Sequence, residues 1–257
     1  MATNYEEKAK QARLKILEMI HKAGTSHIAS CFSIIDVAVV LYKNLKKGDE
    51  VVWSPGWKAA AIYYFLAQQG KIPKEYLNLF GKEVDGKIKY LGLAETNIPG
   101  VLCNGGSVGH GLPVACGIAL AKKLKGEEGK VFCIMSDGEM NEGTTWESAA
   151  FAAHHKLNNL IVIVDKNSWQ AMGRTEDILN IDLVSVWQGL NWKAADLDGH
   201  DYNQIEASFT EDFDFHIPFV NRIGWSADID PQSNYVLDVK YKPLVIIANT
   251  IKGKGVS

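Results

Sequence analysis

Long apolar runs are missing from this chain of 257 residues, and none reaches the length of a membrane span. The opening residues, Met-Ala-Thr-Asn-Tyr-Glu-Glu, also lack the basic and apolar regions of a signal peptide. Excess positive charge is absent too, since 27 Lys and Arg residues face 30 Asp and Glu residues, for a net charge of −3. We therefore expect no membrane partner and no nucleic-acid partner.

Cysteine is sparse as well, because the chain has four and none of them forms a Cys-x-x-Cys pair. Zinc or redox motifs of that spacing are therefore excluded. Cys116 and Cys133 lie in apolar surroundings, so we expect them to be buried thiols of a cytoplasmic protein.

What the chain does contain is an alternation of helical and extended segments. Apolar spacing predicts helices over 5–22, 33–43, 112–124 and 144–156, and from the Ser54-Pro55-Gly56 turn to about Gln69. Short runs rich in branched or aromatic residues predict strands at 51–53, 131–135, 160–164, 192–197 and 244–248. This order predicts an α/β fold, a doubly wound and mostly parallel sheet with helices on both faces, in one domain over 1–257. Residues 70–104 are expected to be irregular with short helices, and residues 208–242 follow neither period.

Two polar signals follow consecutive predicted strands. Asp137 comes just after the strand at 131–135, and Asn167 comes just after the strand at 160–164. A strand, a crossover helix and a strand place the two strands side by side, so both side chains should lie at the carboxyl edge of the sheet. Carboxylate and amide oxygens there suit Mg²⁺, which keeps few protein ligands and completes its shell with phosphate and water. Each residue alone is more simply explained as a helix cap or a turn residue, but the pair favours a Mg²⁺–diphosphate site.

Glycine is placed where a phosphate could approach the backbone. Gly138 follows the candidate ligand Asp137, at the start of the next helix, where backbone N–H groups attract anions. A second glycine-rich turn, Gly105–Gly111, precedes the alanine-rich helix. A turn of this kind is equally well explained as a structural hinge.

These motifs resemble the thiamine diphosphate motif of transketolases. The resemblance rests on Ser-Asp-Gly-Glu at 136–139, Asn-Glu-Gly at 141–143, Trp-Glu-Ser-Ala at 146–149 and Asp-Lys-Asn at 165–167. It extends to 106–111, to Asp-Gly-His-Asp at 198–201 and to 250–255, although Ser136 replaces the glycine that is usual there. It covers the N-terminal, diphosphate-binding half of a transketolase, as found where the enzyme is split into two polypeptides.

The resemblance implies a set of site residues. Asp137, Asn167 and the backbone carbonyl of Trp169 would bind Mg²⁺, for which Ca²⁺ could substitute. The cofactor thiamine diphosphate would contact Gly106, Val108, Gly138, Asn167 and Lys252. His27 and Glu142 would be the catalytic residues, His27 facing the substrate and Glu142 lying, with Glu147, at a contact between two cofactor sites. A solvated helix face is the alternative for these two glutamates.

The resemblance also implies an activity. A ketol unit of two carbons would pass from a ketose to an aldose through a thiamine diphosphate carbanion. The pyrimidine-binding and C-terminal domains would lie on a separate chain, in an α2β2 heterotetramer, so the chain alone should be inactive.

The sequence departs from the family pattern at two histidine positions, which here read Trp57 and Leu93. These departures leave two other interpretations open. One is a different thiamine-dependent carboligase that makes an unusual sugar or metabolite, and the other is a non-catalytic structural homologue.

Overall fold

The computed structural model describes residues 2–84, 87–88, 90, 92–210 and 241–256. Its longer helices are α1 (Ala2–Ala23), α3 (Ile35–Asn44), α4 (Ala59–Gln68), α5 (Gly111–Lys125) and α6 (Gly143–His154). The shorter ones are α2 (Ile28–Ser33), α7 (Thr175–Ile178), α8 (Leu183–Gly189), α9 (Tyr202–Ser208) and the 3₁₀ turns η1 (Gly56–Lys58), η2 (Lys74–Leu79) and η3 (Asp137–Asn141). Within this part of the chain, none of the helices combines the length and the apolar character that a bilayer crossing requires.

The centre of the fold is a parallel five-stranded sheet with the order β1-β4-β5-β9-β8. Its strands are β1 (Glu50–Trp53), β4 (Val131–Ser136), β5 (Leu160–Lys166), β8 (Lys193–Asp198) and β9 (Leu244–Asn249). Short antiparallel pairs lie outside it: β2 (Glu83–Val84) with β3 (Lys87–Ile88), and β6 (Trp169–Gln170) with β7 (Gly173–Arg174). The predicted fold class is confirmed.

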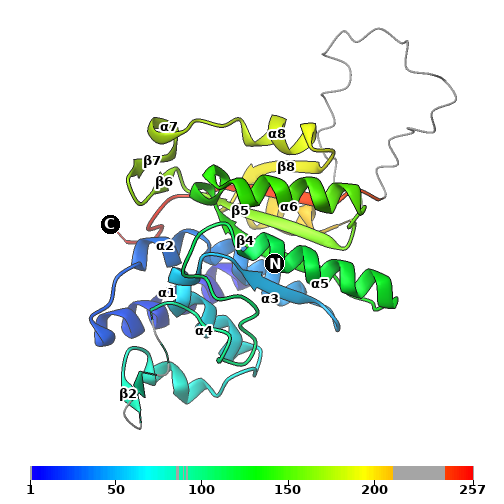
Figure 1. The fold of residues 1–257 in the computed structure, drawn as a ribbon. Coiled ribbons are helices and arrows are strands. Elements are labelled where there is room, and N and C mark those ends of the chain that lie inside the picture. The colour runs from blue at the N-terminus through cyan, green and yellow to red at the C-terminus, as the bar shows by residue number, and fades with distance from the viewer. Residues whose placement is uncertain (1, 85–86, 89, 91, 211–240, 257) are drawn as a thin grey trace, which may run out of the picture.

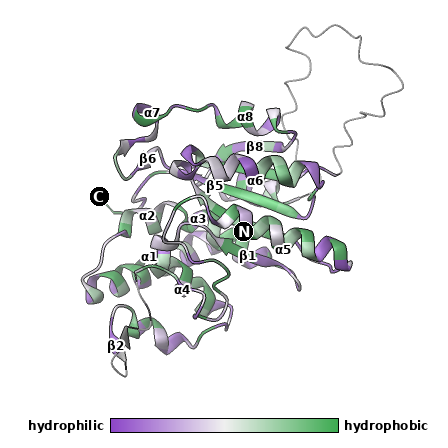
Figure 2. Ribbon diagram, viewed as in Figure 1, coloured by the Kyte–Doolittle hydropathy of each residue, from purple (hydrophilic) through white to green (hydrophobic). Residues whose placement is uncertain are grey.

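Alternating side chains of each strand face opposite sides of the sheet, and both sides are buried. Ile134, Ile163 and Ile246 are in register and pack among α1, α3 and α4. The adjacent row of Cys133 and Val162 packs among α5 and α6 on the other face. Figure 1 shows this arrangement, with the blue and cyan helices on one side of the sheet and the green helices on the other. The central strand β5 is correspondingly hydrophobic in Figure 2.

The main departures from the sequence expectations lie after β5. The β6–β7 pair and the helices α7 and α8 were not predicted, because their segments are too short for an apolar period to show. Cys116 and Cys133 are buried free thiols, as expected. Of the segment 208–242, residues 211–240 lie outside the described part of the chain.

Candidate functional site

The candidate metal ligands lie just past the carboxyl ends of β4 and β5. These strands are paired in register, with Ser136 opposite Asp165, so the expected adjacency of the two strand ends is confirmed. The Ser168 N–H, which follows Asn167, donates to Asp137 Oδ2 at 2.7 Å. Asp137 is 5% exposed and Asn167 is 7% exposed. The two loops therefore bring a buried carboxylate and a buried amide to one edge of the sheet.

The Asp137 carboxylate is poorly compensated. Burial raises its pKa to about 6, and the negative charge of Asp165 adds to this rise, against hydrogen bonds from the Ser168 and Gly138 N–H groups. The amide of Asn167 is oriented by two contacts: its Nδ2 donates to Asp165 Oδ2 at 3.2 Å, and its Oδ1 accepts the Trp169 N–H at 3.2 Å. The site therefore presents an anionic oxygen and a fixed amide oxygen, an arrangement that a divalent cation would stabilise.

Beneath Asn167 lies a buried ion pair that the sequence analysis missed. Lys58 Nζ donates to Asp165 Oδ2 at 2.5 Å, and the side chains are 1% and 0% exposed. Ser33 Oγ and Thr250 Oγ1 also donate to Asp165, at 2.6 and 2.5 Å. Burial alone would raise the pKa of Asp165, but Lys58 and the hydroxyl donors outweigh burial and lower it. An acid in a strand that is buried on both faces needs such partners. The position of Asp165 at the end of an apolar run was therefore the signal in the sequence for a buried partner.

The glycine-rich turn 105–111 packs against the turn that follows β1. A Cβ on Gly56 would come within 2.6 Å of Gly105 Cα, so these backbones touch. Gly106 is exposed and a Cβ there would meet nothing within 4 Å, while Val108 is half-buried. Open space above Gly106 is consistent with a ligand lying over the turn.

Gly138 packs closely against β6. A Cβ at this position would come within 2.9 Å of Gln170 Cβ, so the absence of a side chain is required by packing against β6. Its N–H donates to Asp137 Oδ1 at 3.0 Å.

The remaining candidates surround this edge. His27 precedes α2 in a left-handed conformation with φ 73°, and partial burial, then the charges of Lys252 and Lys58, lower its pKa. Lys252 Nζ lies 5.5 Å from the centroid of the Trp169 ring. Glu142 precedes α6 and is partly exposed.

The two histidine departures lie near each other. The Ala94 N–H, next to Leu93, donates at 3.0 Å to the carbonyl of Gly56, next to Trp57. Leu93 is exposed and Trp57 is half-buried. Both positions are therefore next to residues that meet at Gly56, which packs against Gly105 of the glycine-rich turn.

The segment after β9 is attached to the site at several points. The Ile251 N–H donates to His200 Nε2 at 2.9 Å, and the Gly253 N–H donates to the Ala29 carbonyl at 3.0 Å. Since Nε2 of His200 accepts, the imidazole proton lies on Nδ1 and is donated to Asp36 Oδ2 at 2.7 Å. These contacts hold Lys252 beside α2 and His27.

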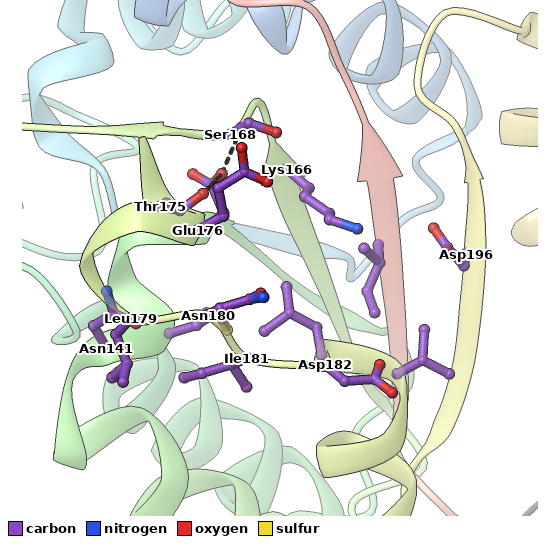
Figure 3. A pocket seen from close by; sticks show the side chains of 15 residues that line it. Asn141, Lys166, Ser168, Thr175, Glu176, Leu179, Asn180, Ile181, Asp182 and Asp196 are labelled. Atoms are coloured by element: carbon purple, nitrogen blue, oxygen red, sulfur yellow. Dashed lines mark hydrogen bonds between the residues drawn. The ribbon is translucent and has the colours of Figure 1, made fainter. Parts of the chain in front are cut away.

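A cavity of about 290 Å³ lies at this edge. Figure 3 shows the side chains that line it, between β5, β9 and the α7–α8 segment. It is lined by Asp137, Met140, Asn141, Lys166, Ser168, Thr175, Glu176, Leu179–Val184, Asp196 and Ile247. Within the described residues, His, Cys, Asp and Glu side chains do not gather in groups of three or more that could hold a metal. The donor set at Asp137 and Asn167 therefore fits Mg²⁺ that takes its other ligands from a phosphate and water.

Comparisons with known proteins agree with this geometry. Residues 5–213 match the family described as "Transketolase, thiamine diphosphate binding domain". An apulose-4-phosphate transketolase subunit of Actinobacillus succinogenes is 32% identical over 98% of this chain and 86% of that protein. A 6-deoxy-6-sulfo-D-fructose transketolase subunit of Clostridium sp. is 29% identical over 98% of this chain and 86% of that protein.

Solved structures give the same answer for the fold. A transketolase from Campylobacter jejuni superposes with a TM-score of 0.81 and 25% identity, over 98% of this chain. The chain spans only 38% of that transketolase. Because the family match covers most of the chain, the chain belongs to the transketolase family and corresponds to its thiamine diphosphate-binding domain.

Proposed function

We propose that this chain is the N-terminal subunit of a two-chain transketolase, which moves a two-carbon ketol unit from a ketose to an aldose. The observation that carries the proposal is the pairing of Asp137 and Asn167 at adjacent ends of β4 and β5, beside the glycine-rich turn. The two relatives described above are named as transketolase subunits, and each has a length similar to that of this chain. One domain over 1–257 agrees with that length.

The residues at this edge would hold the cofactor as follows. Asp137 Oδ, Asn167 Oδ1 and the carbonyl of Trp169 would bind Mg²⁺, and Ca²⁺ could replace it. The diphosphate of thiamine diphosphate would lie near Gly106, Gly138 and the ammonium group of Lys252, and Val108 would pack beside the thiazolium ring. A metal here would compensate the charge of Asp137, whose pKa burial raises to about 6 in the metal-free protein.

Thiamine diphosphate, when bound, supplies an electron sink for the cleavage of a carbon–carbon bond next to a carbonyl. Partial burial, and then the charges of Lys252 and Lys58, lower the pKa of His27, which favours the neutral imidazole. A neutral imidazole accepts a proton from a substrate hydroxyl and returns it to the product. Glu142 would act at the contact between two cofactor sites.

The rest of the active site would come from a second chain that carries the pyrimidine-binding half. The assembly would be an α2β2 heterotetramer in the cytoplasm. The naming of both relatives as subunits, rather than as whole transketolases, supports the requirement for a partner chain.

The second candidate concerns the substrate. Trp57 and Leu93 occupy positions near the glycine-rich turn where the family usually carries imidazoles. An imidazole can donate and accept hydrogen bonds, whereas the indole of Trp57 only donates and the side chain of Leu93 does neither. The relatives named for apulose 4-phosphate and 6-deoxy-6-sulfo-D-fructose act on modified sugars. A modified ketose as the donor is favoured by these observations. The intact oxygen ligands argue against a non-catalytic homologue.

The cofactor site is tested with Asp137→Ala and with a control, Asp182→Ala, which removes a carboxylate from the same cavity and the cap of α8. Calorimetry should show Mg²⁺-dependent binding of thiamine diphosphate by the wild type and by Asp182→Ala, but not by Asp137→Ala. Circular dichroism should be unchanged in all three. Unaltered cofactor affinity in Asp137→Ala would contradict the assignment.

The assembly is tested by activity. Ketol transfer should appear only after the chain is mixed with a pyrimidine-binding transketolase chain. Robust transfer by the purified 257-residue chain alone would contradict the two-chain proposal.

A further inference from the structure

The buried carboxylate of Glu139 is not among the expected site residues, yet it lies in the turn that carries Asp137 and contacts the glycine-rich turn 105–111. Its side chain is 0% exposed. Oε1 accepts the Gly109 N–H at 3.0 Å and the hydroxyl of Ser54. Oε2 accepts the Ser136 N–H at 2.8 Å and the Ser136 hydroxyl at 3.1 Å. Four neutral donors therefore converge on one carboxylate.

These donors come from three segments of the chain, and one of them, Ser136, is the N-cap of the turn η3 that contains Glu139 itself. Ser54 follows β1, Gly109 lies in the glycine-rich turn 105–111, and Ser136 ends β4. The Ser54 hydroxyl also accepts the N–H of Gly111 at 2.9 Å, which makes a second link to the glycine-rich turn. Along the chain, Glu139 is 85 residues from Ser54 and 30 residues from Gly109. The carboxylate thus adds a link between segments that also touch elsewhere, where Gly56 packs against Gly105 and the Ser54 N–H donates to the Ile134 carbonyl.

A carboxylate is required here rather than any polar group. Each of its two oxygens accepts a backbone N–H, from Gly109 on one side and from Ser136 on the other. A backbone N–H cannot reverse its direction, so the amide of a glutamine would place its own NH₂ against one of these donors. Burial raises the pKa of the Glu139 carboxyl, and the four donors oppose that rise by stabilising the carboxylate.

The glycine-rich turn is held on its other side as well. Gly109 has φ 79°, and a Cβ there would come within 2.6 Å of Thr144 Oγ1 and 2.8 Å of Glu142 Cβ. The Thr144 hydroxyl donates to the Gly109 carbonyl at 3.1 Å. Both peptide groups of Gly109 are thus attached to the segment 139–144, next to Val108.

We infer that Glu139 is a positioning residue that holds the glycine-rich turn 105–111 against the turn carrying Asp137 before any cofactor binds. The inference rests on the proposed function only in that it names thiamine diphosphate as the ligand of this preformed site. Without the carboxylate, the hydrogen bonds of the Gly109 and Gly111 N–H groups should be the first to open. Ligand affinity should fall because the turn must then be ordered during binding.

The experiment compares Glu139→Gln and Ser54→Ala with a control, Ser148→Ala. Ser148 is a buried serine of α6 whose hydroxyl donates to the Thr144 carbonyl, so the control loses one buried hydrogen bond away from the Glu139 carboxylate. Amide exchange is followed by NMR in the chain without metal and cofactor, with Ile246 of β9 as the internal reference. Exchange at Gly109 and Gly111 should accelerate at least tenfold in both test variants and stay unchanged in the control. Calorimetry with Mg²⁺ and thiamine diphosphate should show at least tenfold weaker binding in the test variants only.

The outcomes separate this inference from the proposed function. Wild-type exchange rates at Gly109 and Gly111 in Glu139→Gln would overturn the positioning role, whatever the cofactor affinity. Accelerated exchange together with absence of cofactor binding by the wild type would retain the positioning role and reject the proposed function. If Glu139→Gln does not fold, the exchange rates of Ser54→Ala test the positioning role instead. This variant keeps the Glu139 carboxylate and removes only the Ser54 hydroxyl, which donates to Glu139 and accepts the Gly111 N–H.

Discussion

Asp36 offers the sharpest quantitative test of the forces in this fold. It lies on α3 and is 2% exposed. Arg13 of α1 donates to both of its oxygens, at 2.9 and 2.8 Å. His200 Nδ1 and the Tyr202 hydroxyl contact it at 2.7 and 2.8 Å. Burial opposes ionisation of Asp36, but these hydrogen bonds and the charge of Arg13 prevail and lower its pKa to about 2.

The magnitude follows from this pKa. A carboxyl that titrates at 3.8 when unfolded and at about 2 when folded adds about 2.5 kcal/mol to the free energy of unfolding at pH 7. Because the folded pKa is the lower one, this contribution is complete above pH 4 and is lost as the pH falls through 2. Asp36→Asn also leaves the Arg13 guanidinium without its partner, and breaking a buried pair in this way costs about 3–5 kcal/mol in all.

Urea unfolding followed by circular dichroism measures the effect at pH 7 and at pH 3. Asp36→Asn should be about 3–5 kcal/mol less stable than the wild type at pH 7. The difference in stability between the wild type and Asp36→Asn should be about 1 kcal/mol smaller at pH 3, because the Asp36 carboxyl of the unfolded chain is already protonated there. Tyr202→Phe, which removes one donor and keeps the charge, should lose only about 1 kcal/mol. A difference below about 1 kcal/mol at pH 7, or one that widens toward pH 3, would refute the reasoning.

Two further predictions concern the site. Lys58→Met should lower the free energy of unfolding by about 3–5 kcal/mol, because Asp165 is left charged and buried. The double variant with Asp165→Asn should be no less stable than Lys58→Met alone. If urea unfolding shows that the losses of the two single variants add, the buried pair is contradicted. With a partner chain present, xylulose 5-phosphate should be a poor donor, because Trp57 and Leu93 remove hydrogen-bonding imidazoles near the glycine-rich turn. A specificity constant of about 10⁴ M⁻¹s⁻¹ or more, from steady-state kinetics, would leave an ordinary transketolase as the better description.

The sequence alone determined the class of fold and the edge of the sheet where the site lies. Runs such as Leu160–Val164 are short, branched and apolar, which is the local signature of a strand buried on both faces, and β5 is such a strand. Parallel strands joined by a crossover helix share one carboxyl edge, so the positions of Asp137 and Asn167 followed from their places after the strands.

Only the tertiary structure decided which charged residues are buried and what each of them contacts. In the sequence, Lys58 is part of a helix-opening turn and Glu139 is one position of a motif, and nothing local indicates that either is buried. Lys58 can be buried because it pairs with Asp165, which is 107 residues away along the chain. Lys58 Nζ lies 2.5 Å from Asp165 Oδ2. Glu139 is buried because three segments supply donors to it. A local pattern can mark an acid in a buried strand, such as Asp165, but the partners of a buried charge are brought together only by the folded chain.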